Sequence, residues 1–152
     1  MRSIVHEIKY KGNLELGVIT GKLLGETLVK EGLSEFDGII PVRLHPKKER
    51  LRGFNQSDLL ADGISSVIHK PVYKEAFIRK KYNSTQTKKR RYERYINSKE
   101  VFSVSDIESL KGKHMLLVDD VITTGATIEA CAGSLLEVEG LKLSVATLAV
   151  GV

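Results

Sequence analysis

Residues 114–138 read HMLLVDDVITTGATIEACAGSLLEV, and this stretch decides the fold. It opens with four apolar residues at 115–118, a run that is too short for a helix and is bounded by charge. Such a run predicts a buried strand. Two carboxylates, Asp119 and Asp120, close that strand. Residues 123–127, TTGAT, then make a small loop that is rich in hydroxyl groups.

The apolar residues after this loop recur at helical spacing. They fall at positions i, i+3, i+4, i+7 and i+8, which predicts an amphipathic helix with Thr127 as its N-cap. The stripe comprises Ile128, Cys131, Ala132, Leu135 and Leu136. A strand, an acidic tip, a loop hinged at Gly125 and a helix start together predict a binding place for a phosphorylated sugar.

Each part of this unit suits one part of such a ligand. Free N–H groups in the loop and at the helix start, with the positive end of the helix dipole, attract a phosphate. Gly125 lets the backbone approach closely, and the threonine hydroxyls donate further hydrogen bonds. The two carboxylates offer acceptors only, which suits a vicinal diol or a hard divalent cation.

Two other interpretations of this stretch compete. An apolar strand that ends in two aspartates also resembles the magnesium-binding strand of P-loop NTPases. The nearest candidate loop, GVITGK at residues 17–22, is two residues too short for that motif. An ordinary strand, turn and capped helix of an α/β domain would explain the apolar pattern. It would not explain two adjacent acids followed by three threonines.

The segment VDDVITTGAT at residues 118–127 resembles the phosphoribosyl-pyrophosphate (PRPP) motif of type I phosphoribosyltransferases at every position. The resemblance implies that Asp119 and Asp120 hold the ribose hydroxyls and that the loop wraps the 5′-phosphate. The implied PRPP-binding residues are Asp119, Asp120, Val121, Ile122, Thr123, Thr124, Gly125, Ala126 and Thr127. Three more segments, KYKGN, PVRLHPKKERLRGFNQSDLLA and TQTKKRRYERYIN, are similar to the ComF branch, whose members are associated with competence.

This resemblance covers nearly the whole chain and implies an α/β fold of the type I phosphoribosyltransferase kind. We expect one domain over residues 1–152, with a mostly parallel central sheet flanked by helices. The alternation of strands and helices along the chain favours the same arrangement. Residues 1–35 are expected to form an N-terminal helix and a hood over the acceptor, with Tyr10 and Lys11 as candidate contacts. Residues 79–97 are expected to form a mobile basic loop.

Size and composition are those of a single globular domain. The chain has 152 residues and a mass of 16.9 kDa, with 41% hydrophobic and 28% charged residues. No apolar run is long enough for a membrane span, and no signal-peptide core begins the sequence, so we expect a cytoplasmic protein without a membrane partner. The single cysteine, Cys131, lies on the apolar stripe and is expected to be a buried structural thiol. Many ComF relatives carry an N-terminal four-cysteine zinc module, which one cysteine cannot supply.

The net charge of +5 is concentrated in two segments. Residues 43–52 hold five basic residues and one acid, and residues 78–95 hold eight basic residues and one acid. These segments carry +4 and +7, so the rest of the chain carries −6. Focused basic charge of this kind attracts a polyanion, either a pyrophosphate or a nucleic-acid backbone.

The first thirty residues predict a helix that begins after Asn13 as N-cap and runs to about Lys30. Its apolar residues at helical spacing are Leu16, Ile19, Leu23 and Leu24. Glycine recurs every four residues, at Gly17, Gly21 and Gly25. Each glycine costs about 1 kcal/mol of helix stability, so the row predicts a face on which another backbone packs closely.

A buried strand is predicted at residues 36–42, and Pro41 should end its regular pairing. The residues that follow lie where open α/β sheets place their ligands. By resemblance they form the pyrophosphate loop, with Arg43 and Leu44 as candidates, although relatives often have a second proline in place of Arg43. His45 is expected to be a surface imidazole.

The segment RGFNQ at residues 52–56 precedes a helix that Asn55 is placed to cap. The core stripe of this helix comprises Leu60, Ile64, Val67 and Ile68. Arg52 and Asn55 have two interpretations, a loop with a helix cap or a pair of residues that face the ligand, and the spacing does not decide between them. Residues 72–78 predict a short strand, and residues 142–150 predict the last strand.

Residues 79–97 are basic and contain interleaved tyrosines. By resemblance this is the loop that closes over the pyrophosphate, because Thr85, Gln86, Arg94 and Asn97 match the family pattern. The side chains that would neutralise the leaving group are Lys88, Lys89, Arg90 and Arg91. A solvated basic run without a role, and a surface for single-stranded nucleic acid, remain open as alternatives.

The resulting hypothesis is a phosphoribosyltransferase-type reaction between PRPP and a nucleobase-like acceptor, with pyrophosphate as leaving group. The predicted catalytic residues are Asp119, Asp120 and Arg43, and the cofactor is Mg²⁺ carried by PRPP without direct protein ligands. The alternative is a DNA-uptake protein that binds single-stranded DNA, or other DNA-uptake proteins, with PRPP as a regulatory ligand. A scaffold without either activity is the third hypothesis. The acceptor stays open, as does the choice between a monomer and a homodimer.

Overall fold

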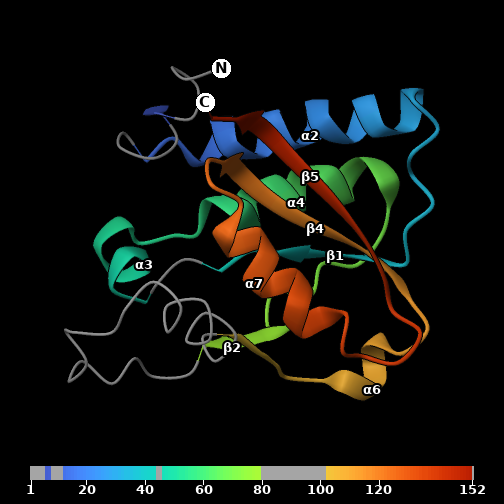
Figure 1. Ribbon diagram of the computed structural model, residues 1–152. Coiled ribbons are helices and arrows are strands. Elements are labelled where there is room, and N and C mark those ends of the chain that lie inside the picture. The colour runs from blue at the N-terminus through green and yellow to red at the C-terminus, as the bar shows by residue number, and fades with distance from the viewer. Residues whose placement is uncertain (1–5, 8–11, 44–45, 80–101, 152) are drawn as a thin grey trace.

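A parallel sheet forms the centre of the molecule (Figure 1). The structure is a computed structural model that describes residues 6–7, 12–43, 46–79 and 102–151. Within those residues the sheet has three strands in the order β1 (Gly38–Pro41), β4 (His114–Ile122) and β5 (Lys142–Val150). Parallel strands end at the same edge of a sheet, so whatever follows β1 and β4 is brought to one place. The predicted α/β fold with a mostly parallel sheet is confirmed.

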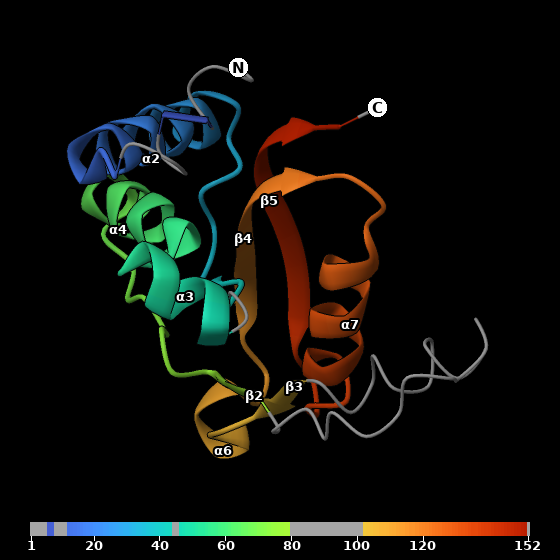
Figure 2. The ribbon, with the colours of Figure 1, turned by 90° about the vertical axis from the view of Figure 1, so that its left-hand side faces the viewer.

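Helices cover both faces of this sheet (Figure 2). α2 (Leu14–Lys30) and α4 (Gln56–Ile68) lie on one side, and α7 (Ala126–Leu135) lies on the other. Successive side chains of β4 alternate between the two sides, as the pleat requires. Leu116 and Val118 join the core beneath α4, whereas Met115 and Leu117 join the core beneath α7. These four side chains are at most 1% exposed, so the apolar run is buried on both faces as predicted.

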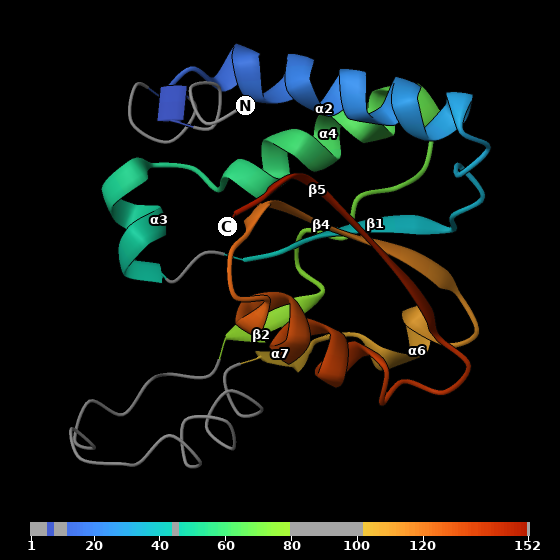
Figure 3. The same cartoon turned by 45° about the horizontal axis from the view of Figure 1, so that its top comes forward.

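Smaller elements lie around the edges of the sheet. They are α3 (Pro46–Arg52), β2 (Phe77–Arg79), β3 (Phe102–Val104) and α6 (Ile107–Leu110). β2 and β3 pair with each other in antiparallel orientation. α3 lies at the end of the sheet where β4 and β5 finish, as do the starts of α4 and α7 (Figure 3). Among the described helices, none combines the length and the apolar character needed to cross a membrane.

The row of glycines in α2 packs directly against α4. A Cβ atom on Gly21 would lie 2.4 Å from the carbonyl oxygen of Leu60, and one on Gly63 of α4 would lie 2.3 Å from the carbonyl oxygen of Val18. No real side chain fits at such distances, so the two backbones meet without side chains between them. The predicted glycine face is confirmed, and Asn13 caps α2 by accepting a hydrogen bond from the Leu16 N–H at 3.0 Å. Leu23, in contrast, is 58% exposed.

Three expectations about the central unit are wrong. β4 does not end at the two aspartates but runs on to Ile122, because β5 continues to pair beside it and places Asp119 opposite Thr147. The N-cap of α7 is Gly125 and not Thr127, because Gly125 adopts the left-handed conformation with φ 80° and the helix starts at Ala126. The predicted apolar stripe of α7 also stops one residue early, since Leu136 is 57% exposed.

Candidate functional site

The two aspartates of β4 face the start of α4. The hydroxyl of Ser57 donates a hydrogen bond to Asp119 Oδ1 at 3.2 Å, and the amide Nε2 of Gln56 donates to Asp120 Oδ2 at 3.2 Å. Backbone N–H groups add a bond to each carboxylate, from Asp120 to Asp119 Oδ1 at 2.9 Å and from Val121 to Asp120 Oδ1 at 2.7 Å. Every one of these donors is uncharged. The helix dipole of α4 also points its positive end at the pair.

Burial changes the acid strength of one member of this carboxylate pair. The pKa of Asp119 rises from 3.8 to about 6, first because the carboxyl is buried and second because the charge of Asp120 is adjacent. Hydrogen bonds from the Asp120 backbone and from the Ser57 hydroxyl lower this pKa and so oppose the effect. Burial therefore disfavours the charged form of Asp119. Donors from a ligand, such as sugar hydroxyls, would stabilise it.

The loop after β4 presents its polar groups outward. Thr123, Thr124 and Thr127 are exposed, and the N–H of Ala126 lies 3.4 Å from the Thr124 hydroxyl oxygen. The space around Gly125 is open, because a Cβ atom there would meet nothing within 4 Å. α7 begins in this loop, so its first N–H groups lie beside exposed threonines. This is an environment for an anion such as a phosphate.

Val121 and Ile122 connect the aspartates to this loop. Both are half-buried, and they pair with Ala149 and Val150 of β5. The Thr147 hydroxyl donates to the carbonyl oxygen of Asp120 at 2.9 Å. The predicted PRPP-binding residues therefore form one continuous surface from the carboxylate pair to the start of α7.

Arg43 lies at the carboxyl end of β1, and its ion pairs are with acids other than Asp119 and Asp120. Its guanidinium forms ion pairs with three other acids, Glu75 at 2.7 Å, Asp58 at 3.3 Å and Glu49 at 3.4 Å. These acids come from α3, α4 and the segment before β2. In the described structure Arg43 thus connects four parts of the chain.

Arg52 and Asn55 both belong to networks at the start of α4. Arg52 Nη1 donates to Gln56 Oε1 at 2.7 Å, and Asn55 Nδ2 donates to the Val42 carbonyl at 3.1 Å and to Asp58 Oδ1 at 3.0 Å. Asn55 occupies the N-cap position but makes no side-chain capping bond. Its Oδ1 atom is buried and has no hydrogen-bond partner among the described residues. Burial raises the pKa of Asp58, and Arg43 and the Asn55 amide oppose that rise.

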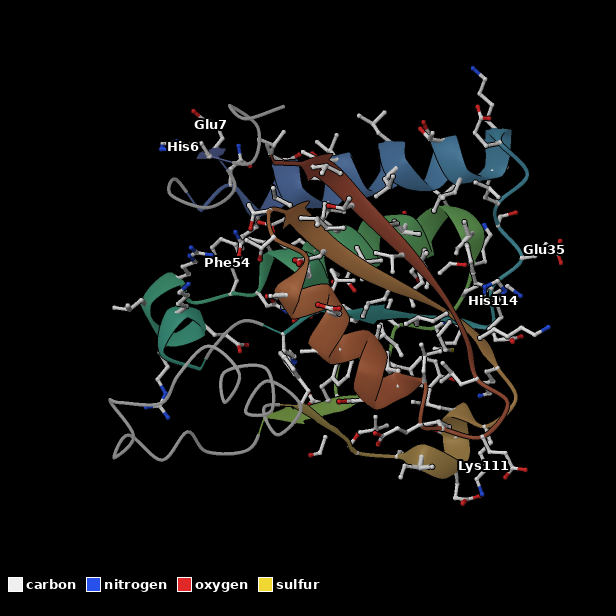
Figure 4. The ribbon with its side chains drawn as sticks, viewed as in Figure 1. His6, Glu7, Glu35, Phe54, Lys111 and His114 are labelled. Carbon is white, nitrogen blue, oxygen red and sulfur yellow. The ribbon has the colours of Figure 1, made fainter. Side chains whose placement is uncertain are left out.

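The sequence did not point to Gln56 and Ser57 as site residues. Both are almost fully buried, at 2% and 3% exposure, in the helix start that the sequence placed correctly. A signal existed in the RGFNQS segment, because it follows a strand whose carboxyl end shares an edge with β4. Figure 4 shows that this segment lies far from the amino end of β4, because Phe54 and His114 are at opposite ends of the molecule.

Several predicted site residues fall outside the described part of the chain. They are Leu44, Lys88, Lys89, Arg90 and Arg91, together with Tyr10, Lys11, Thr85, Gln86, Arg94 and Asn97. The expected surface imidazole His45 lies outside the described residues as well. Within the described residues, no cluster of three or more His, Cys, Asp or Glu side chains is placed to hold a metal ion. The carboxylate pair alone is an incomplete site for Mg²⁺, which prefers six oxygen ligands. It fits a metal that arrives already bound to phosphates.

Comparison with known structures supports the fold. The chain is similar to glutamine PRPP amidotransferase from B. subtilis, with TM-score 0.58, 22% identity and coverage of 86% of this chain and 26% of that one. It is also similar to a purine phosphoribosyltransferase from Pyrococcus horikoshii, with TM-score 0.57, 21% identity and coverage of 88% and 73%. At these identities the likeness concerns the fold alone.

Comparison with known sequences gives the family. The phosphoribosyl transferase domain model matches residues 59–151. Relatives include the DNA utilization protein YhgH of Escherichia coli O157:H7, 34% identical over 88% of this chain, and competence protein ComFC of Bacillus subtilis, 30% identical over 90%. The chain spans 60% and 54% of the length of these two relatives. It belongs to the phosphoribosyl transferase domain family, and within it to the ComF branch.

Proposed function

We propose that this protein binds PRPP and transfers its phosphoribosyl group to a nucleobase-like acceptor. The observation that carries the proposal is the continuous surface from the Asp119–Asp120 pair to the exposed threonine loop at the start of α7. Carboxylates offer hydrogen-bond acceptors that suit the 2- and 3-hydroxyls of a ribose, and the loop suits its 5-phosphate. One ligand that contains both groups a few ångströms apart would satisfy both ends of the surface.

The reaction would need placed charge more than a covalent nucleophile. The bond between C1 of the ribose and pyrophosphate breaks, its electron pair leaves with pyrophosphate, and a nitrogen lone pair of the acceptor forms the new bond to C1. Asp119 and Asp120 would hold the ribose and stabilise the positive charge that develops on it. The threonine loop would supply binding energy away from the reacting bond. Mg²⁺, carried in with the pyrophosphate, would neutralise part of its charge.

Arg43 could stabilise pyrophosphate only after it releases one of its present partners. Its three ion pairs occupy the guanidinium in the described structure. To stabilise pyrophosphate, Arg43 would have to exchange at least one carboxylate for a phosphate oxygen. The exposed partner, Glu75, is the easiest to release, since its side chain is 89% exposed and water can replace the contact.

Isothermal titration calorimetry with PRPP and Mg²⁺ tests the proposal. The wild-type protein should bind, and an Asp119→Asn/Asp120→Asn variant that keeps its circular dichroism spectrum should not. Asp62→Asn is the matched control, because Asp62 lies on α4 in an exposed pair with Lys74. Absence of binding by the wild type, or equal binding by the double variant, would contradict the proposal.

A second candidate function is binding of single-stranded DNA, which the names of the relatives suggest. The structural observation in its favour is α3, where Lys48 and Arg50 are exposed beside Leu51, which is 87% exposed. Cations next to an exposed apolar side chain suit a strand whose phosphates pair while its bases stack. Replacing both cations with alanine should weaken binding in fluorescence anisotropy and make the slope of affinity against salt less steep by about 1.4. Replacement of Lys22 and Lys30, exposed on α2, is the control.

A further inference from the structure

The first residues of α4 donate hydrogen bonds to the carboxylate pair, and one of them, Gln56, also accepts a hydrogen bond from Arg52. Gln56 lies between Arg52 and Asp120, with 2.7 Å from Arg52 Nη1 to Gln56 Oε1 and 3.2 Å from Gln56 Nε2 to Asp120 Oδ2. Ser57, the next residue, reaches Asp119 Oδ1 at 3.2 Å. Both side chains are almost fully buried, so they have little freedom to turn elsewhere.

The orientation of the Gln56 amide follows from the chemistry of its two neighbours. A guanidinium can only donate hydrogen bonds, so the oxygen of the amide must face Arg52. The amide nitrogen is then turned towards Asp120, where an ionised carboxylate can only accept. A reversed amide would oppose donor to donor on one side and acceptor to acceptor on the other. Arg52 therefore decides which end of Gln56 the carboxylate meets.

This arrangement differs in its consequence from a direct ion pair. A guanidinium in contact with Asp120 would occupy its oxygens in a bidentate fashion and neutralise its charge. Through Gln56, Arg52 acts on the direction of Asp120 Oδ2 by way of a neutral donor. The bonds that Asp119 accepts from Ser57 and from the Asp120 N–H both end on Oδ1, so its second oxygen is turned away from these donors.

We propose that Gln56 and Ser57 are positioning residues that aim the two carboxylates at the vicinal diol of a pentose, and that Arg52 acts through Gln56 to set its amide. This inference rests on the proposed function for the identity of the ligand. The RGFNQS segment is then part of the ligand site, through residues that do not themselves touch the ligand. The sequence left two interpretations of Arg52 open, a loop residue or a residue that faces the ligand. The proposed role differs from both, because Arg52 acts on the ligand site through Gln56.

Calorimetric titration of PRPP in the presence of Mg²⁺ is the first test. Gln56→Met keeps the length of the side chain and removes the amide, and Ser57→Ala removes the hydroxyl. Each should weaken binding about tenfold, which corresponds to the loss of one hydrogen bond to a charged group. Ser66→Ala is the control, because Ser66 is on the same helix and its hydroxyl donates to the Gly63 carbonyl at 2.7 Å. Unchanged affinity in both site variants would overturn the inference.

A double-mutant cycle tests the action of Arg52 through Gln56. Arg52→Met should weaken binding alone, but in the Gln56→Met background it should have a clearly smaller effect, because the amide it orients is gone. A merely structural role of Arg52 would lower stability and would give additive effects on affinity. Additive effects would refute the relay from Arg52 to Asp120.

A measurement without ligand separates this inference from the proposed function. In the free protein, a carbon-13 NMR titration follows the carboxyl of Asp119, whose charged neighbour is Asp120 on the same strand. Ser57→Ala should move the titration midpoint of Asp119 upward, since the hydroxyl stabilises the ionised form. Ser66→Ala should leave it unchanged. If PRPP fails to bind but the midpoint moves, the proposed function falls while the contact between Ser57 and Asp119 stands. An unmoved midpoint would overturn the assigned role of Ser57.

Discussion

The first turn of α4 supports two networks that treat charge in opposite ways. Gln56 and Ser57 hold the Asp119–Asp120 pair with neutral donors, whereas the next residue, Asp58, joins Glu49 and Glu75 around Arg43. In the Arg43 network each acid meets a cation, whereas Gln56 and Ser57 are neutral donors to the carboxylate pair. We interpret the Arg43 network as a source of stability and the carboxylate pair as a site that gives up stability for binding.

The largest expected effect removes the charge of the carboxylate pair. Asp119→Asn/Asp120→Asn should reduce PRPP affinity by at least about a hundredfold, because two charge-assisted hydrogen bonds to the ribose are lost. The thermal unfolding midpoint should not fall. A variant that binds normally, measured by calorimetry, would show that the pair is a structural feature like the Arg43 network.

The second effect has the opposite character and concerns stability. Arg43→Met should lower the free energy of unfolding by about 2–3 kcal/mol, because Asp58 and Glu49 lose their cation in a partly buried place. Urea unfolding at pH 7.5 measures this change. Lys74→Met, which breaks the exposed pair with Asp62, should cost at most about 1 kcal/mol and serves as control. Equal costs in the two variants would remove the distinction drawn for Arg43.

The third effect is a pH-dependent gain in stability, in contrast to the loss expected for Arg43→Met. The pKa of Asp119 is raised to about 6 in the folded protein from 3.8, so the folded state binds more protons between these values. Stability is therefore lost as the pH rises through this window, and the loss is complete above it. Asp119→Asn should stabilise the protein by about 1–2 kcal/mol at pH 7.5. The gain should disappear about one pH unit below 3.8, where the carboxyl is protonated in both states. A gain that is independent of pH would have another cause.

The smallest effect is the contribution of Glu75 alone to the stability that the Arg43 network provides. Glu75→Gln should change the free energy of unfolding by no more than about 0.5 kcal/mol, although its ion pair is the shortest of the three. The reason is exposure, since water screens a contact whose acid is 89% exposed. A loss as large as that of Arg43→Met in the same urea experiment would mean that exposure is a poor guide here.

The contrast between the two networks also shows how far sequence reasoning reaches. The apolar run of β4, the Asn13 cap and the glycine face of α2 depend on residues close in sequence or on a repeat, and each was predicted correctly. The contacts of Ser57 and Gln56 with the aspartates join residues 62 and 64 positions apart, and no local pattern encodes them. The end of β4 was misplaced for a related reason. Pairing with β5, and not the hydropathy of Asp119 and Asp120, decides how far that strand extends.

The direct backbone contact between α2 and α4 has a mechanical consequence. Side chains between helices normally act as a compliant layer that absorbs small displacements, but at Gly21 and Gly63 this layer is missing. The two helices should therefore move as one rigid body, so that a displacement of one helix also displaces the other. A methyl group added at Gly21 would change the packing of α4 against α2. We expect this change to move Gln56 and Ser57 away from β4. The precision of the carboxylate pair is then set partly by a contact that no ligand approaches.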